Sequence, residues 1–459
     1  MSNIFFYALI LYLVLFIGIG VLDLKKIKNF RDYSVAGKNQ SMVAVTMTLL
    51  ATVVGASTTI GITDTVYSIG FPGIWWLAFG SIGLMLQSFV LSEKVRGINA
   101  DTLPDLAKKT VGTSAEKVIA FIIVISWIGV IAGQFVAMNS LITFALGKQS
   151  RAVFVVVSII VIAYTAIGGQ LSVVKTDKIQ LGIIFLGILC CMAFLYVGLG
   201  KDTASVFENV ELLNENYGPM NLFTQFFVIG GVYFLGPDIM SRNFIAKDGK
   251  TAKRAAATAG LLLLLFSLVI TLIGMWMKYN VSPEKIGEGS VLMYAVSLLP
   301  KPIAVLLIFG LLSAIVSSTD TCMINASTIF VKDILKKENV NSVRMTVVVL
   351  GGAALCLAAL GRSDIMNLLT GAYSVYTPGV IFPLAVAIFA YEKYSMKKKV
   401  WLSAVVAGGL FGILGNYFKT SLLAMGVTEG ILSYFSLFGM GISLVLALVS
   451  VNWKEKNHG

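Results

Sequence analysis

The sequence predicts an all-α polytopic membrane protein, and three observations favour this class. Of the 459 residues, 57% are hydrophobic and only 13% are charged, and the mean hydropathy is +0.87. Apolar runs long enough to cross a bilayer recur along the whole chain. Most of the 35 Lys and Arg residues fall on one side when these runs are taken as alternate crossings. A soluble fold of this length does not carry so large an apolar fraction.

Taken in chain order, the apolar runs predict 13 transmembrane helices. They lie at about 4–22, 42–66, 71–92, 117–145, 152–169, 177–200, 220–240, 255–279, 302–331, 345–361, 365–391, 400–418 and 430–452. The first run has no basic segment before it and no small-residue cleavage site after it, so we expect a membrane anchor.

The distribution of Lys and Arg predicts the orientation. With the N-terminus outside, the inner segments hold most of the basic residues, including a group from Arg242 to Arg254. Because basic residues concentrate on the cytoplasmic side, we expect the N-terminus outside and the C-terminus in the cytoplasm of a cell inner (plasma) membrane. The formal charge of +12 is then a consequence of topology, and no nucleic-acid partner is expected.

Several functional classes lack their characteristic residues. The one histidine, His458, lies beside the C-terminus, so acid–base catalysis or metal binding by a histidine is not expected. No phosphate-binding loop of the G-x-x-x-x-G-K-S/T type occurs. The four cysteines all lie in apolar runs, which favours buried thiols over a disulfide framework. We therefore expect neither an enzyme, an organic cofactor nor ATP-driven pumping.

Two of the predicted spans contain helix-breaking residues near their middle. The second has Gly55 followed by hydroxyl residues, and the seventh has Gly230–Gly231 and then Gly236–Pro237. In transporters built from inverted repeats, the first helix of each repeat is unwound, and the freed backbone groups face substrate and ion. The five-span separation predicts a five-plus-five inverted-repeat core with repeats at about 42–200 and 220–391.

This interpretation divides the chain into three parts. We expect an N-terminal peripheral helix at 1–31, a transport core at 32–392, and two C-terminal peripheral helices with a short tail at 393–459.

The stretch "AIVSSTDT" (314–321) places hydroxyls and a carboxylate inside the ninth span. Ala314, Ser317, Ser318 and Thr321 follow helical spacing and share one face. Their hydroxyl and carbonyl oxygens suit a small hard cation such as sodium. The alternative, bonding of hydroxyls to backbone carbonyls or between helices, does not account for Asp320 in the same turn, because a carboxylate at membrane depth usually serves an ion or substrate path.

Other polar residues at membrane depth leave two interpretations open. Asp177 is equally suited to an ion pair near the interface and to cation binding. Gln134 is suited to a contact between helices or to substrate binding. Asp64 is expected toward the outside, where it would gate or meet a substrate, and Asp238 is expected to cap structure on the cytoplasmic side. Tyr233, beside the second break, is an aromatic candidate for packing or for substrate contact.

At this point the chain resembles a known family, the sodium:solute symporters, whose bacterial members carry proline, pantothenate, sialic acid and sugars. The resemblance rests on five segments in order. They are "DYSVAGKNQS" (32–41), "ADTLPDLAKKTVG" (100–112), "YTAIGGQLSVVKTDKIQ" (164–180), "GPDIMSRNFIAKD" (236–248) and "GLLSAIVSSTDTCMINASTIFVKDI" (310–334). The resemblance implies 13 helices around a LeuT-like five-plus-five core.

The resemblance also implies a principal sodium site. Its ligands would be the backbone oxygens of Ala51 and Val54, the carbonyl of Ala314, and the hydroxyls of Ser317 and Ser318. The last three coincide with the helix face deduced above.

Some members have a second cation site, which falls here on Asp177, Ser317, Asp320 and Thr321. Where one such member has a hydroxyl, this chain has Asp320. Two neighbouring carboxylates would bind a second cation, or one of them would hold a proton.

For the solute we expect a pocket formed by Gly55, Ser57, Thr58, Gln134 and Tyr233. The third core helix has no arginine at membrane depth, which argues against the way sialic-acid carriers hold a carboxylate. A half-helix N-terminus remains available for other anions.

The sequence therefore predicts a symporter that imports a small polar organic solute by alternating access, with Na⁺ as coupling ion and the lipid bilayer as its surroundings. Two alternatives stay open: a proton-coupled carrier, and a transporter-like membrane sensor or receptor that would need a separate signalling partner.

Overall fold

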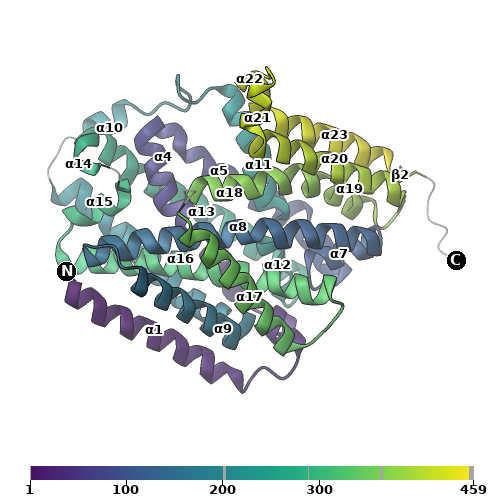
Figure 1. The fold of residues 1–459 in the computed structure, drawn as a ribbon, viewed down its shortest axis with the longest axis horizontal. Coiled ribbons are helices and arrows are strands. Elements are labelled where there is room, and N and C mark those ends of the chain that lie inside the picture. Colours follow the sequence, from purple (N-terminus) through teal and green to yellow (C-terminus); the bar gives the residue numbers. More distant parts are fainter. Residues whose placement is uncertain (1, 200–202, 288, 362–364, 454–459) are drawn as a thin grey trace.

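The structure is a computed structural model that describes residues 2–199, 203–287, 289–361 and 365–453. These residues are overwhelmingly helical (Figure 1). Within them, the extended structure that pairs into a sheet is one short antiparallel ladder, β1 (Ser395–Met396) with β2 (Val451–Asn452). Most of the expected C-terminal tail, residues 454–459, lies outside the described residues.

The N-terminal half of the chain runs from α1 to α10. Its helices are α1 (Ser2–Leu24), α2 (Phe30–Val35), α3 (Met42–Val53), α4 (Ile62–Ile69), α5 (Trp75–Val90), α6 (Ser92–Ile98), α7 (Leu103–Thr110), α8 (Thr113–Leu146), α9 (Arg151–Ala193) and α10 (Ala204–Glu208). Short 3₁₀ or π-helical turns accompany them at Ala36–Lys38, Ser57–Gly61, Phe71–Ile74 and Phe194–Gly198.

The C-terminal half runs from α11 to α23. Its helices are α11 (Pro219–Leu235), α12 (Pro237–Ile245), α13 (Gly249–Asn280), α14 (Pro283–Ile286), α15 (Val291–Leu298), α16 (Lys301–Ile329), α17 (Val340–Ala359), α18 (Ile365–Tyr376), α19 (Phe382–Ala390), α20 (Lys398–Tyr417), α21 (Lys419–Ala424), α22 (Glu429–Ser433) and α23 (Phe435–Val449). π-Helical turns at Phe330–Ile334 and Thr377–Ile381 continue α16 and join α18 to α19.

Among the described residues, 11 helices are long and apolar enough to cross a membrane, or 12 if one bent pair counts as a single span. The expected number was 13. The difference lies in the run Arg151–Gly198, which is helical over 48 residues where we expected two spans. At 1.5 Å per residue this run is about 70 Å long, more than twice the hydrocarbon thickness of about 30 Å, so it is too long for one straight crossing.

Gly169 interrupts this long run. Its φ of 57° and ψ of −166° are not helical, and a side chain is disfavoured at such a φ. A Cβ there would lie 2.6 Å from a ring carbon of Tyr33 in α2. The hydroxyl of Tyr33 donates to the carbonyl of Ala166 at 2.8 Å. The break in α9 is therefore covered by α2, which satisfies a carbonyl that the helix leaves free.

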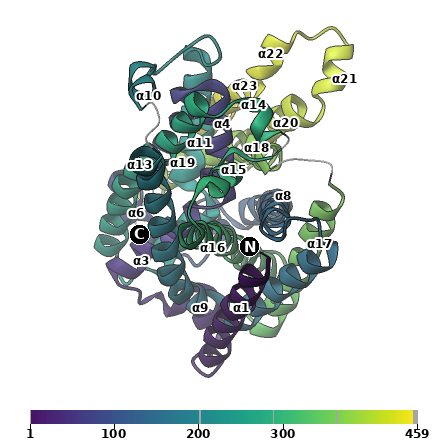
Figure 2. The ribbon, with the colours of Figure 1, turned by 90° about the vertical axis from the view of Figure 1, so that its left-hand side faces the viewer.

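Helix α16 lies at the centre of the molecule (Figure 2). It packs against α9, α8 and α3, while α1 packs on the outer side of α9. Every side chain of α16 from Gly310 to Ile329 is buried. The polar residues of α16 are thus enclosed by protein rather than by lipid or water.

Both predicted helix breaks occur. Helix α3 ends at Val53, and the chain bends by 64° before it continues as Ser57–Ile69. Helix α11 ends at Leu235, and Gly236 is extended with ψ of 148° before α12 begins. The glycine pair Gly230–Gly231 stays inside α11, so the second break coincides with Gly236–Pro237 alone.

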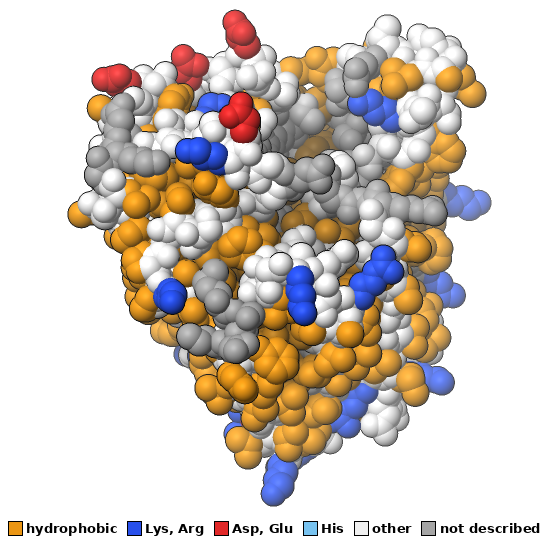
Figure 3. Space-filling model, turned by 60° about the vertical axis from the view of Figure 1, so that its left-hand side comes forward, with side chains coloured by type: hydrophobic (Ala, Val, Ile, Leu, Met, Phe, Trp, Pro, Cys, Tyr) orange, Lys and Arg blue, Asp and Glu red, His pale blue; other side chains and the backbone are white. Residues whose placement is uncertain are grey.

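A broad apolar surface surrounds the bundle. Figure 3 shows hydrophobic side chains over much of one face. Large exposed hydrophobic residues from several helices contribute to such surfaces, among them Leu11, Phe89, Phe121, Leu186, Leu265 and Val349. Because a water-exposed surface of this kind is unusual, its natural surroundings are lipid. Helix α1 begins at the left end of Figure 1 and β2 lies at the right end.

Candidate functional site

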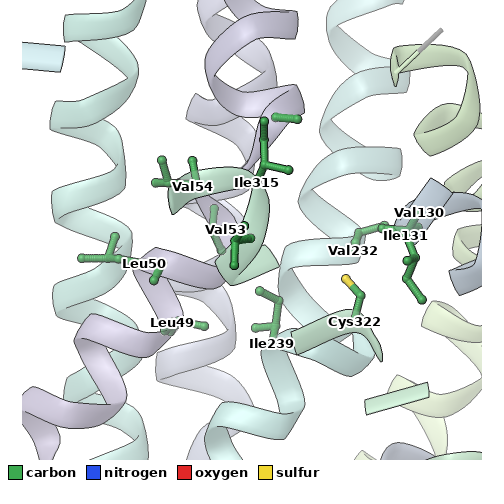
Figure 4. Close-up of a cluster of buried hydrophobic side chains, with 14 of the residues drawn as sticks. Leu49, Leu50, Val53, Val54, Val130, Ile131, Val232, Ile239, Ile315 and Cys322 are labelled. Carbon is green, nitrogen blue, oxygen red and sulfur yellow. The ribbon is translucent and has the colours of Figure 1, made fainter. Parts of the chain in front are cut away.

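The bend after α3 exposes backbone groups in the middle of the bundle. Val54 has φ of −81° and ψ of 85°, outside the helical region, and Figure 4 shows it with Val53 at the bend. Gly55 follows. A Cβ at Gly55 would lie 2.5 Å from the hydroxyl of Ser318 in α16. Glycine at this position therefore allows the unwound segment to approach α16 closely.

Two serines of α16 reach the end of α3. The hydroxyl of Ser317 donates to the carbonyl of Ala51 at 2.9 Å and to that of Ala314 at 3.2 Å. The hydroxyl of Ser318 donates to the carbonyl of Thr52 at 3.0 Å. Of the five residues expected to bind sodium, Ala51, Ala314 and Ser317 are joined by these bonds. Val54 is fully buried beside them.

This group of oxygens has the chemistry of a site for a small hard cation. Carbonyls carry two lone pairs each, and a hydroxyl can accept as well as donate. A cation among them would take the carbonyl lone pairs that now accept the serine protons. Oxygens without formal charge suit sodium, which is hard and singly charged.

A buried arginine stands next to this group. Arg242 of α12 is 0% exposed. Its Nη2 donates to the hydroxyl of Thr52 at 2.7 Å and also to that of Thr321, and it lies 3.5 Å from the carboxylate of Asp177. The hydroxyl of Thr48 donates to the same carboxylate oxygen. Arg242 was grouped above with cytoplasmic loop residues, and that placement is wrong.

The expected second cation site is divided in the structure. Asp177 and Thr321 meet around the guanidinium of Arg242. Asp320 points elsewhere, because its Oδ1 accepts from the hydroxyl of Thr165 at 2.6 Å. The other oxygen of Asp320 is buried and has no hydrogen-bond partner among the described residues.

A small cavity of about 50 Å³ lies beside the bend. Four of the five residues expected for the solute line it: Gly55, Ser57, Gln134 and Tyr233. The fifth, Thr58, does not. Its hydroxyl accepts from the backbone N–H of Gly55 at 2.8 Å and donates to the carbonyl of Val53 at 3.0 Å, so Thr58 holds the bend together.

Gln134 of α8 has two roles at once. Its side-chain carbonyl accepts from the backbone N–H of Ala56 at 3.2 Å, and the residue also lines the cavity. Two N–H groups of the bend, those of Gly55 and Ala56, are thus bonded by Thr58 and Gln134.

Four lining residues were not expected in the solute pocket. Asp238, expected to cap cytoplasmic structure, lies in the cavity wall with Trp127, Cys322 and Tyr373. The indole N–H of Trp127 donates to Asp238 at 2.5 Å, and the Nδ2 of Asn325 donates at 2.8 Å. The apolar part of the wall, including Cys322, is drawn in Figure 4. The position of Asp238 directly after Gly236–Pro237 was the available signal.

A second, larger hollow of about 940 Å³ is lined by Asp64, Asn139 and Ser290 among others. Asp64 accepts from the hydroxyl of Ser290 at 3.1 Å and from the N–H of Val291 at 2.7 Å, so it caps α15. Helix α18 contributes Met366 to this hollow and Leu369, about one turn later, to the small cavity. One turn of α18 therefore separates the two spaces.

A family model described as the sodium:solute symporter family matches residues 33–397. Among characterised relatives, the osmoregulated proline transporter OpuE of Bacillus subtilis (strain 168) is 25% identical over 432 residues, which cover 87% of this chain and 86% of the relative. The sodium/pantothenate symporter of Haemophilus influenzae is 24% identical over 353 residues and covers 71% of both chains. The sodium/proline symporter of Staphylococcus aureus is 24% identical and covers 88% of this chain and 84% of its own.

Solved structures share the fold. A Na⁺-coupled sialic acid symporter in a substrate-bound outward-open state aligns with a TM-score of 0.79 at 16% identity, over 99% of both chains. A nucleobase-cation-symport-1 family transporter in a closed conformation aligns with a TM-score of 0.62 at 13% identity, over 91% of this chain and 93% of the other. At these identities the likeness shows the fold, which is that of LeuT-like transporters.

Proposed function

The chain belongs to the sodium:solute symporter family, and on that premise we propose that it imports a small polar organic solute together with sodium by alternating access. As a family member it is a membrane transport protein and a symporter, not an enzyme. What remains to be proposed is the ion, its site, the solute pocket and the direction of transport.

One observation carries the proposal: the hydroxyls of Ser317 and Ser318 both reach carbonyls at the broken end of α3. Sodium would bind here to the backbone oxygens of Ala51 and Val54, the carbonyl of Ala314 and the two hydroxyls. These oxygens belong to two different helices. Sodium binding therefore stabilises the arrangement in which α3 and α16 are in contact, and it favours the state that binds solute.

Sodium and solute raise each other's affinity in this scheme, because the sodium ligands and the cavity share the bend at Gly55 and residue Ser318. The membrane potential adds to the driving force. A single positive charge that crosses 100 mV contributes about 2.3 kcal/mol, in addition to the sodium gradient.

We expect one sodium ion per cycle. The guanidinium of Arg242 already supplies a positive charge beside Asp177 and Thr321, and a cation in the same place would be repelled. In this chain the guanidinium of Arg242 would take the place of the second cation, which we expected to bind to Asp177, Asp320 and Thr321.

For the solute, the pocket would be the cavity lined by Gly55, Ser57, Gln134 and Tyr233, with Thr58 holding the bend. The larger hollow near Asp64 would be the path from outside. This orientation rests on the bias of Lys and Arg, which favours an outer N-terminus and a cytoplasmic C-terminus in the plasma membrane.

We also propose that the run Arg151–Gly198 crosses twice, with the break at Gly169, which gives 13 spans around two five-helix repeats.

A second candidate is coupling to protons. It is favoured by Asp320, a fully buried carboxyl with one oxygen that no described residue bonds. Buried carboxyls of this kind serve as proton carriers in transporters.

Melting of the purified protein in sodium, potassium and caesium chloride at equal ionic strength tests the proposal without knowledge of the solute. A ligand that binds only the folded state raises the melting temperature. We expect a rise specific to sodium that Ser317→Ala abolishes. The matched control is Ser313→Ala, since Ser313 is a buried serine of the same helix whose hydroxyl is bonded to Tyr12 at 3.1 Å. If melting depends on pH but not on the cation, and Asp320→Asn removes that dependence, the proton-coupled alternative replaces the proposal.

A further inference from the structure

We infer that the organic solute carries a positively charged nitrogen group and that Asp238 binds this group. The inference rests on the proposed function and specifies its substrate class. Among the described residues that line the small cavity, Asp238 is the one that bears a charge. A transport pocket whose fixed charge is negative selects cations over anions.

The carboxylate of Asp238 is held in place by neutral donors. Its Oδ2 accepts from the indole N–H of Trp127 at 2.5 Å and from the thiol of Cys322 at 3.4 Å, and its Oδ1 accepts from Asn325 at 2.8 Å. These donors come from α8 and α16. A carboxylate offers about four acceptor sites, so the three bonds leave capacity for a ligand.

No described basic side chain forms an ion pair with Asp238. Arg242 lies one helical turn further along α12, but the polar contacts of its guanidinium are with Thr52, Thr321 and Asp177. Asp177 thus forms an ion pair with Arg242, whereas Asp238 is attracted by the same guanidinium without pairing with it. Since burial of a charge that has no adjacent counter-charge is costly, a cationic ligand gains by binding beside Asp238.

Asp238 does not have the role of a helix cap. It lies in the first turn of α12, yet its side chain accepts no backbone N–H of that helix, and the capping position is taken by Gly236. Its oxygens face the cavity wall formed by other helices. Its charge is favourable in the first turn of α12, but a capping hydrogen bond does not account for an aspartate at this position.

One aromatic ring, that of Trp127, contacts the carboxylate, and other rings lie near it. Trp127 has its ring centroid 5.2 Å from that of Tyr376 and 6.5 Å from that of Tyr373, and Tyr233 lines the same cavity. The face of an aromatic ring attracts ammonium groups. A carboxylate among aromatic rings is suited to a charged amine.

Two backbone donors of the bend are not available to an anionic group. The backbone N–H groups of Gly55 and Ala56, which would otherwise bind a carboxylate at the broken helix, are taken by Thr58 and Gln134. The cavity of about 50 Å³ has room for a few water molecules, since about 10–15 Å³ of such volume holds one. A small amine head group suits a space of this size.

Four two-carbon probes of similar size and different charge test the inference by melting in sodium chloride: ethanolamine, glycine, glycolate and ethylene glycol. We expect ethanolamine to raise the melting temperature more than the neutral and anionic probes. In Asp238→Asn the half-saturating concentration of ethanolamine should rise at least about tenfold, as for loss of a charged hydrogen bond. Glu93→Gln, which alters an exposed carboxylate outside both cavities, should leave the half-saturating concentration of ethanolamine unchanged.

The sodium response of the same variants separates this inference from the proposed function. If Asp238→Asn keeps the sodium-specific stabilisation, it is folded and its sodium site is intact, so the loss of ethanolamine binding reports on Asp238. If sodium stabilises the protein but glycolate or ethylene glycol binds in preference, or if Asp238→Asn and Asp238→Glu bind ethanolamine as the wild type does, the inference is overturned while the symporter proposal stands. Absence of any sodium response contradicts the proposed function itself.

Discussion

Arg242 has a buried guanidinium whose acceptors lie on three other helices. Thr52 of α3, Asp177 of α9 and Thr321 of α16 all lie within 3.5 Å of it. A buried charge that loses its partner is left uncompensated, which usually costs more than the pair contributes. The folded protein should therefore lose more stability when Arg242 or Asp177 is replaced alone than when both are replaced together.

We predict that Arg242→Gln and Asp177→Asn each destabilise the folded protein by about 3–5 kcal/mol. The double variant should be more stable than either single variant, because both members of the ion pair are then neutral. Melting temperatures of the four proteins form a double-mutant cycle that measures the coupling. Additive losses would mean that the two side chains do not form the pair described here.

At the level of single residues, sequence reasoning found positions within one helix and missed contacts between helices. The spacing of Ala314, Ser317 and Ser318 fixes their shared face. Nothing in that spacing tells which helix the face meets. Arg242 and Asp238 show the same limit, because each follows Pro237 closely and looks like part of a loop until α12 is placed inside the bundle.

At the level of elements, an ion-pair cluster joins three connecting segments at the end of the bundle that we expect in the cytoplasm. Asp101, between α6 and α7, lies 2.5 Å from the ammonium of Lys38 and also pairs with Lys332. Lys332 reaches Asp105 at 3.4 Å as well. Burial alone would raise the pKa of Asp101, but the ammonium groups of Lys332 and Lys38 outweigh it and lower this pKa to about 2.

The cluster gives a prediction for acid stability. Because the pKa of Asp101 is lower in the folded protein than in the unfolded chain, ionised Asp101 stabilises the fold above about pH 4, and this contribution is lost as the pH falls toward 2. At pH 6, Asp101→Asn should therefore lower the free energy of unfolding by about 2 kcal/mol. Its melting temperature should be correspondingly lower than that of the wild type. The difference should shrink when both are measured near pH 3. A difference that is constant with pH would contradict the ionic role of Asp101.

Helix breaks that are marked by glycine or proline together with suitable neighbours could be predicted from the sequence. Gly55 with its hydroxyl neighbours and Gly236–Pro237 both mark real bends. The pair Gly230–Gly231 marks none, because glycine permits a break but does not require one. The break at Gly169 lies inside a continuous helical run, and its reason is the ring of Tyr33 from a distant part of the chain.

For the whole molecule, the two ends of the bundle differ. A hollow of about 940 Å³ opens near α4 and α15, whereas the opposite end contains the cluster of Asp101, Lys38 and Lys332. The fold class followed from composition and hydropathy, since lipid allows few backbone structures. The division into repeats and the path of the solute depend on tertiary packing, which periodicity does not encode.

The central claim, that Ser317 and the end of α3 form one sodium site, is tested most directly by equilibrium binding of ²²Na⁺ to the purified protein. The account predicts saturable binding of about one ion per chain, a dissociation constant at least about tenfold higher in Ser317→Ala, and wild-type binding in Ser313→Ala. Two ions per chain would contradict the role given to Arg242. Unchanged binding in Ser317→Ala, or no saturable binding at all, would contradict the site.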